Sequence, residues 1–214
     1  MQKKSPGSDK HGNTPYVKVS TNDVGKLKIV SDITKYVFGK KENAKIFLQG
    51  GENMNKYMQE KIEPYIGLES FKFGDTLSEV RNKLKSDKIA FSQSVDPHKG
   101  CQPEVAWTFI EINKSITLCF ALDVLFEIVL EGQYVGSTPE GFFVGMPFQK
   151  LLELDKTLEY NEDDEDYISE KGYWFEENIE TGKVASITVF IPEANDNNEF
   201  FGYNWVPKYR RSTI

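Results

Sequence analysis

The sequence contains few of the residues from which metal centres, disulfide frameworks and nucleophilic sites are built. Its 214 residues include two cysteines, Cys101 and Cys119, and two histidines, His11 and His98. Two cysteines are too few to define a disulfide framework, and neither has the paired spacing of a zinc site. We therefore expect no metal and no cofactor. The sequence leaves open whether Cys101 and Cys119 pair.

Long apolar runs and catalytic signatures are also absent. No apolar stretch approaches the roughly 20 residues of a membrane-spanning helix, and the first residues lack the apolar core of a secretory signal. A G-x-S-x-G elbow, a phosphate loop and a dinucleotide fingerprint are missing. These absences favour a cytoplasmic protein with no enzymatic activity and no membrane partner. One enzymatic alternative is a nucleophilic pair of His98 and Cys101, although residues so close in sequence seldom take opposed positions.

Charge is distributed unevenly along the chain. Residues 1–53 carry ten lysines against five acidic residues, a net charge of +5, whereas residues 54–214 carry 16 basic against 28 acidic residues, a net charge of −12. A change of sign between segments indicates two parts with different partners. We expect no direct contact with nucleic acid.

A short motif occurs twice. F-K-F-G-D-T-L begins at Phe71 and F-F-V-G-M-P-F begins at Phe142, 71 residues later. A helix-like stretch follows each motif, expected near 76–85 and 147–154, and each helix is followed by short strand-like runs. A repeat of this length is one supersecondary unit that has been copied, each copy laying a helix on a small sheet.

The expected fold class is α+β, with two tandem helix-on-antiparallel-sheet repeats preceded by a small three-stranded β segment. The expected strands of the repeats are 88–93, 105–112, 115–121 and 124–131, then 157–160, 166–169, 172–177 and 184–191. The strands of the N-terminal segment are expected at 16–20, 26–30 and 44–49. The expected domains are 1–53, 54–135, and 136–214 with a C-terminal tail.

The two copies resemble the tandem repeats of the β-lactamase-inhibitor-protein superfamily, and the single unit of the SmpA-type outer-membrane assembly lipoproteins. The resemblance covers about residues 64–192 and rests on the glycine-containing start, a helix with Glu-Val or Leu-Leu, and a closing hairpin. It implies two helix-on-sheet units whose outer sheet faces join into one surface. The chain departs from the inhibitor pattern because it lacks an export signal and a cysteine pair in each repeat. An inhibitor of antibiotic-degrading enzymes and an exported lipoprotein are therefore disfavoured.

A third use of such folds is in immunity proteins of bacterial polymorphic toxin systems of the contact-dependent inhibition type. Residues 1–53 resemble the end of a toxin nuclease domain, and the stretch from Met54 resembles the start of a separate immunity protein. The resemblance implies a non-enzymatic protein that binds and neutralises a basic cognate toxin, with a nuclease as the expected class. Two alternatives stay open: a scaffold or assembly module of the SmpA type, and an ordinary β-subdomain at residues 1–53. The oligomeric state also stays open.

An acidic run in the second repeat is the first candidate binding site. It consists of Glu162, Asp163, Asp164, Glu165 and Asp166. Clustered carboxylates can imitate phosphates and dock into the basic cleft of a nuclease, because complementary potentials speed encounter and enforce specificity. The competing interpretation is a solvated loop that keeps the protein soluble.

Aromatic residues of the second repeat form the second candidate. Strand alternation places Trp174 and Glu176 on the face opposite Phe175, and places Phe190 on the same outer face as Trp174. Exposed aromatic side chains on an acidic surface are typical anchors for a partner protein. In the competing interpretation, the aromatic tail after residue 193 folds back and covers this face.

Overall fold

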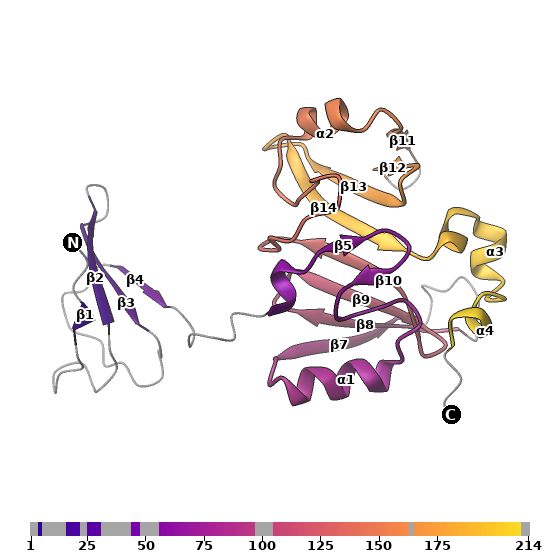
Figure 1. Ribbon diagram of the computed structural model, residues 1–214, viewed down its shortest axis with the longest axis horizontal. Coiled ribbons are helices and arrows are strands. Elements are labelled where there is room, and N and C mark those ends of the chain that lie inside the picture. The colour runs from indigo at the N-terminus through magenta and orange to yellow at the C-terminus, as the bar shows by residue number, and fades with distance from the viewer. Residues whose placement is uncertain are drawn as a thin grey trace. The chain divides into compact units, whose positions relative to one another are not determined.

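The computed structural model describes residues 56–96, 105–162 and 165–210, together with the backbone of four short strands nearer the N-terminus. The chain divides into two compact units, Met1–Lys56 and Tyr57–Ile214 (Figure 1). The acidic second unit contains both copies of the repeated motif.

The first unit contains a four-stranded sheet in the order β1-β2-β3-β4. Its strands are β1 (Lys4–Ser5), β2 (Tyr16–Thr21), β3 (Gly25–Val30) and β4 (Ala44–Phe47). Strands β1 to β3 pair antiparallel, while β4 pairs parallel to β3. The three expected strands correspond to β2, β3 and β4, whereas the two-residue strand β1 was not expected.

The second unit is built on one antiparallel sheet of eight strands. In sheet order the strands are β11 (Glu159–Asn161), β12 (Asp166–Ser169), β13 (Tyr173–Asn178), β14 (Lys183–Phe190), β10 (Val124–Glu131), β9 (Ile116–Ala121), β8 (Trp107–Ile112) and β7 (Phe91–Asp96). Two helices, α1 (Leu77–Ser86) and α2 (Phe148–Leu154), precede the two groups of strands along the chain. The fold class is α+β, as the sequence predicts.

The sheet order has the symmetry of the repeat. Each repeat supplies a helix and a meander of four strands, and the last strand of each meander lies at the centre of the sheet. There β10 and β14 pair antiparallel, from Glu127 opposite Phe190 to Glu131 opposite Ser186. The two repeats therefore share one continuous sheet, with β7 and β11 at its two edges (Figure 1).

The repeated glycine has the same structural role in both copies. Gly74 and Gly145 have φ angles of +94° and +86°, a conformation that favours glycine. The N–H of Gly74 donates to the carbonyl of Leu125 over 2.9 Å, and the N–H of Gly145 donates to the carbonyl of Val184 over 2.8 Å. Each glycine thus turns the chain into its helix while it pairs with the first residues of the closing strand.

A β-bulge also recurs at the same place in both hairpins. The strand register shifts once in each hairpin. The extra residue is Phe126 in β10 and Ala185 in β14. A bulge bends the strand and increases its local twist. Because the bulges occur at matching positions, the repeat is a copy of detailed geometry as well as of strand order.

Shorter elements lie before and after the repeats. They are η1 (Lys56–Gln59), β5 (Ile62–Glu63), β6 (Gly67–Leu68), η2 (Pro192–Asn195), α3 (Asn197–Phe201) and α4 (Val206–Tyr209). We call α3 and α4 the C-terminal helices.

The C-terminal helices carry an aromatic cluster that packs on the first repeat. The Trp107 ring lies 4.7 Å from the Phe126 ring and 5.7 Å from the Phe200 ring, and its indole N–H donates to the Tyr203 hydroxyl over 3.0 Å. Trp205 stacks on Phe200 at 5.8 Å. All five side chains are buried, so the tail covers the end of the first repeat where β8 begins.

Candidate protein-binding site

The acidic run lies at the turn between β11 and β12. Glu162 and Glu165 are exposed, and Asp166 is the first residue of β12. Asp163 and Asp164 lie outside the described residues. The described members of the run therefore border the turn at one edge of the sheet.

Trp174 and Phe190 share a face of the sheet, as predicted, and their rings stack 4.0 Å apart. The prediction that Phe190 is exposed is wrong, because its side chain is fully buried. The ring of Tyr65, in the turn between β5 and β6, packs edge-on against Phe190 at 6.1 Å, so this turn helps to cover the face. Trp174 is half-buried and Glu176 is exposed. Phe190 is thus a core residue and is removed from the candidate site.

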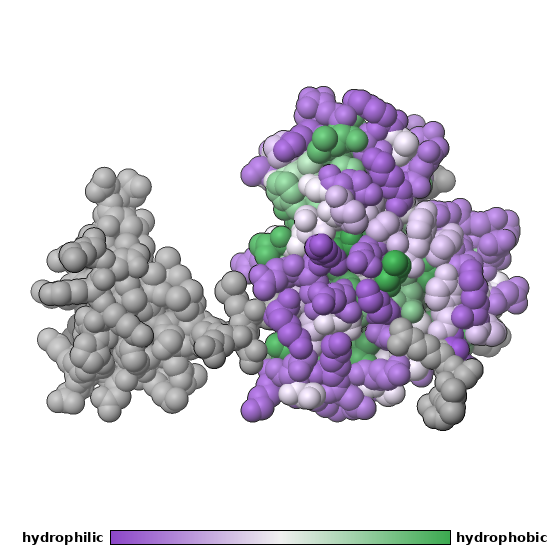
Figure 2. All heavy atoms as spheres, in the orientation of Figure 1, coloured by the Kyte–Doolittle hydropathy of each residue, from purple (hydrophilic) through white to green (hydrophobic). Residues whose placement is uncertain are grey.

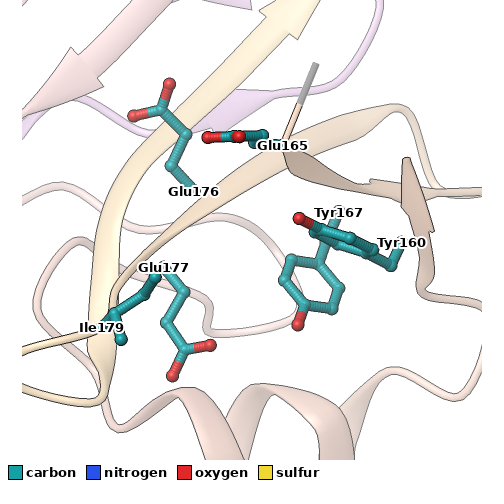
Figure 3. Close-up of a pocket in the computed structure, with 6 residues that line it drawn as sticks. All are labelled: Tyr160, Glu165, Tyr167, Glu176, Glu177 and Ile179. Atoms are coloured by element: carbon teal, nitrogen blue, oxygen red, sulfur yellow. The ribbon is translucent and has the colours of Figure 1, made fainter. Parts of the chain in front are cut away.

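A hollow of about 440 Å³ brings two of the predicted residues together with four others (Figure 3). We call it the acidic hollow. It is lined by Tyr160, Glu165, Tyr167, Glu176, Glu177 and Ile179. These residues come from β11, the following turn, β12, β13 and the turn after β13. Their contributions meet because β11, β12 and β13 are neighbours in the sheet.

Two tyrosines form an aromatic wall of the acidic hollow. Tyr160 and Tyr167 are paired across β11 and β12, and their ring centroids lie 5.0 Å apart. Tyr167 also packs against Phe148 of α2, with centroids 4.6 Å apart, which fixes its ring against the helix. Tyr160 stays 53% exposed. Tyr167 is therefore held against α2, while Tyr160 exposes aromatic surface to solvent.

Three carboxylates give the acidic hollow its charge. In Figure 3, the Glu165 side chain points toward Glu176, whose carboxylate is directed away from the tyrosines, while Glu177 extends between Ile179 and the tyrosines. Within residues 56–96, 105–162 and 165–210, none of these three glutamates forms a salt bridge. Burial, and then the negative charge of Glu177, raise the pKa of the Tyr167 phenol. The site accordingly favours a cation over an anion.

Ile179 adds an apolar contact at the rim. It lies in the turn between β13 and β14 and is 90% exposed, whereas most residues on the face seen in Figure 2 are hydrophilic. An isolated exposed apolar residue needs no special explanation. One that borders a hollow with an exposed tyrosine adds to a mixed apolar and acidic surface suited to a protein partner.

A buried carboxylate holds the strands of the site in place. Asp155, at the end of α2, accepts a hydrogen bond from the Ser169 hydroxyl over 2.6 Å and one from the Thr157 hydroxyl over 2.7 Å. The Lys171 ammonium lies 3.2 Å from the same carboxylate. Burial opposes ionisation of Asp155, but these donors outweigh it and keep its pKa below the ordinary value. The network ties α2 to the end of β12 and so supports Tyr167.

Sequence reasoning found Glu165 and Glu176 but missed the other four lining residues. Tyr160, Tyr167 and Glu177 lie on three strands whose pairing brings them together, and no local pattern reports that pairing. Ile179 had a usable signal. It is a large apolar residue flanked by Asn178 and Glu180 next to a turn, where polar residues are usual.

Other kinds of site find no support in the part of the chain that the structure describes. There, no three histidine, cysteine, aspartate or glutamate side chains group closely enough to hold a metal ion. No helix formed by these residues has the length and apolar character to cross a membrane. His98 and Cys101 lie outside the described residues, and Cys119 is buried. Comparison with family models, with curated proteins and with solved structures finds no match for this chain.

Proposed function

We propose that the acidic unit, residues 57–214, is an immunity protein that binds and neutralises a cognate bacterial toxin in the cytoplasm. The observation that carries this proposal is the acidic hollow, which is lined by three glutamates, two tyrosines and the exposed Ile179. A rigid, negatively charged surface with aromatic and apolar contacts suits a basic protein partner. A nuclease is the expected class of toxin, because an enzyme that cuts nucleic acid carries a basic cleft.

Two further observations support the proposal. The tandem repeat resembles folds that act by binding other proteins, and both copies have the same strand order around the centre of the sheet. The net charge of −12 in residues 54–214 favours encounter with a basic protein over contact with nucleic acid. Inhibition would then come from occlusion of the toxin's active site, so the immunity protein itself needs no catalytic group.

The proposal also gives an origin for the first unit. Residues 1–53 carry a net charge of +5 and, in our proposal, represent the C-terminal strands of a toxin domain that has become fused to its antidote. We assign these strands no activity of their own.

The test is capture of the partner from the native organism with the full chain as bait, followed by identification and purification of the captured protein. We expect a basic protein with nuclease or other toxic activity, and we expect a stoichiometric amount of the bait to abolish that activity. Co-production of the chain should also protect cells that make the toxin. The immunity proposal is excluded if the identified partner is non-toxic, such as an assembly factor, or if its activity is unchanged by saturating bait.

A further inference from the structure

The two repeats differ sharply at the hairpin that carries the bulge, although their backbones match there. The residues paired beside the bulge are Cys119 and Phe120 in the first repeat, and Glu176 and Glu177 in the second. Cys119 and Phe120 are each 1% exposed, whereas Glu176 is exposed. Equivalent positions are thus apolar and buried in one copy, whereas in the other they are acidic, with Glu176 exposed and Glu177 half-buried.

In the first repeat, this end is covered by the chain's own C-terminal segment. The backbone oxygen of Tyr209 lies 2.5 Å from the point where a Cβ on Gly74 would stand. The Arg210 guanidinium donates over 2.9 Å to the carbonyl of Leu122, which lies in the turn between β9 and β10. The covering segment, from Trp205 to Arg210, is aromatic and basic.

In the second repeat, no described residue takes the equivalent place. A Cβ on Gly145, the counterpart of Gly74, would meet nothing within 4 Å, and the same is true of Gly182 in the turn after β13. This is the turn that carries Ile179 at 90% exposure, and the acidic hollow lies beside it. Within the described part of the chain, the second repeat therefore leaves open a surface that its copy covers.

We infer that this open end of the second repeat is the docking surface for a basic segment of a partner protein, which places a lysine or arginine side chain in the acidic hollow. The inference rests on the proposed function, since the toxin is the partner that would supply the segment. The first repeat shows that the equivalent hairpin accommodates a chain segment, because Arg210 of its own cover donates to the Leu122 carbonyl in the turn, while Lys208 pairs with Glu193 of the tail.

The chemistry of the acidic hollow matches that occupant. A cation over the faces of Tyr160 and Tyr167 is attracted by the π-electrons of the rings, and carboxylates at the rim accept charge-assisted hydrogen bonds from it. The aliphatic stem of a lysine or arginine can pack on Ile179 while its charged end lies in the hollow. A phosphate backbone would be repelled by the same three glutamates.

The test uses the full chain and an N-acetylated hexa-arginine amide as the probe. Binding is measured by calorimetry and mapped by amide chemical shifts in the double variant Glu176→Gln/Glu177→Gln and in the wild type. The matched control is Glu111→Gln/Glu131→Gln, which removes the same charge from two exposed positions of the first repeat. Far-ultraviolet circular dichroism confirms that both variants stay folded.

We expect the probe to shift amides of residues 160–179, and its affinity to fall about tenfold or more in the Glu176/Glu177 variant. The control should lose less than about twofold, because distant exposed charges are screened at physiological ionic strength. Equal losses in the two variants, shifts that map to another surface, or no binding of the probe by the wild type would overturn the docking site.

The docking site and the proposed function fail in different ways. An identified toxin that binds the wild type and both double variants with equal affinity would leave the immunity function standing and overturn the docking site. A probe that binds as expected, combined with a captured partner that has no toxic activity, would support the docking site and exclude the immunity function.

Discussion

At the scale of single residues, Asp155 shows how one buried charge supports the candidate site. Its side chain is fully buried, and its carboxylate accepts hydrogen bonds from two hydroxyl groups and the Thr157 backbone N–H and pairs with one ammonium group. Replacement by alanine removes the acceptor and leaves Ser169 and Lys171 without it. We expect Asp155→Ala to lower the free energy of unfolding by about 2–4 kcal/mol in urea denaturation. Glu153→Ala, an exposed change on α2, should stay within about 0.5 kcal/mol.

The same residue makes stability depend on pH in a defined direction. The folded-state pKa of Asp155 is depressed, so its contribution is fully present above the unfolded pKa of about 3.9 and is lost as pH falls through the lower folded-state value. The difference in unfolding free energy between wild type and Asp155→Asn should be constant from pH 7 to 5. It should shrink below about pH 4. A difference that instead grows with acid would contradict this assignment.

Gly74 and Gly145 occupy equivalent positions, so the cost of an alanine substitution can be compared between them. Gly74 and Gly145 both have positive φ, so alanine is strained at either position. At Gly74 the new methyl group would also meet the Tyr209 carbonyl oxygen at 2.5 Å, whereas at Gly145 it would meet no described atom within 4 Å. We expect Gly145→Ala to cost about 1–2 kcal/mol and Gly74→Ala clearly more, as measured by denaturant midpoints.

A second measurement distinguishes backbone strain at Gly74 from the steric clash with Tyr209. The clash would displace α4, so amide hydrogens of residues 205–210 should exchange faster in Gly74→Ala than in Gly145→Ala. Equal exchange in the two variants would show that Tyr209 does not press on this position.

At the scale of elements, the local sequence rules work well for the first helix. Thr76 accepts a hydrogen bond from the Glu79 N–H, and the Glu79 carboxylate accepts one from the Thr76 N–H, so a capping box begins α1. The way in which α1 ends explains why β7 begins later in the chain than the sequence predicts. The N–H of Ile89 donates to the carbonyl of Leu84, and Lys88 has a φ of +57°. These residues finish the helix, and β7 therefore begins at Phe91, three residues later than expected.

The C-terminal helices are integral to the fold of the first repeat. Trp205 is buried, stacks on Phe200, and donates its indole N–H to the Phe200 carbonyl over 2.8 Å. We expect Trp205→Ala to lower the free energy of unfolding by about 3–5 kcal/mol, because it leaves a cavity within the aromatic cluster. Ile179→Ala, at a position 90% exposed, is the control and should be close to neutral. Comparable losses in the two variants would show that the cluster contributes little.

At the scale of the whole molecule, the two compact units predict independent folding of the larger one. The boundary falls between Lys56 and Tyr57, and the second unit contains the complete eight-stranded sheet and both helices of the repeat. Residues 54–214 produced alone should be soluble and should unfold cooperatively at the same urea concentration as the second unit of the full chain. An insoluble or unfolded fragment would exclude the fusion of a toxin remnant with a separate immunity protein.

The duplicated order of a helix and four strands can be predicted from the amino-acid sequence alone. Three local features predict that order: strand alternation, the Thr76 cap, and the glycines at positions 74 and 145, which adopt positive φ. Such signals act over a few residues, so they survive without knowledge of the rest of the chain.

The folded chain was needed to show which surfaces are covered. Alternation placed Trp174 and Phe190 on one face correctly, but it could not show that Tyr65, more than a hundred residues away in sequence, packs against Phe190. The tail likewise covers the first repeat and leaves the acidic hollow of the second open. Burial depends on contacts between segments distant in sequence, and two copies of one pattern can therefore end with opposite exposure.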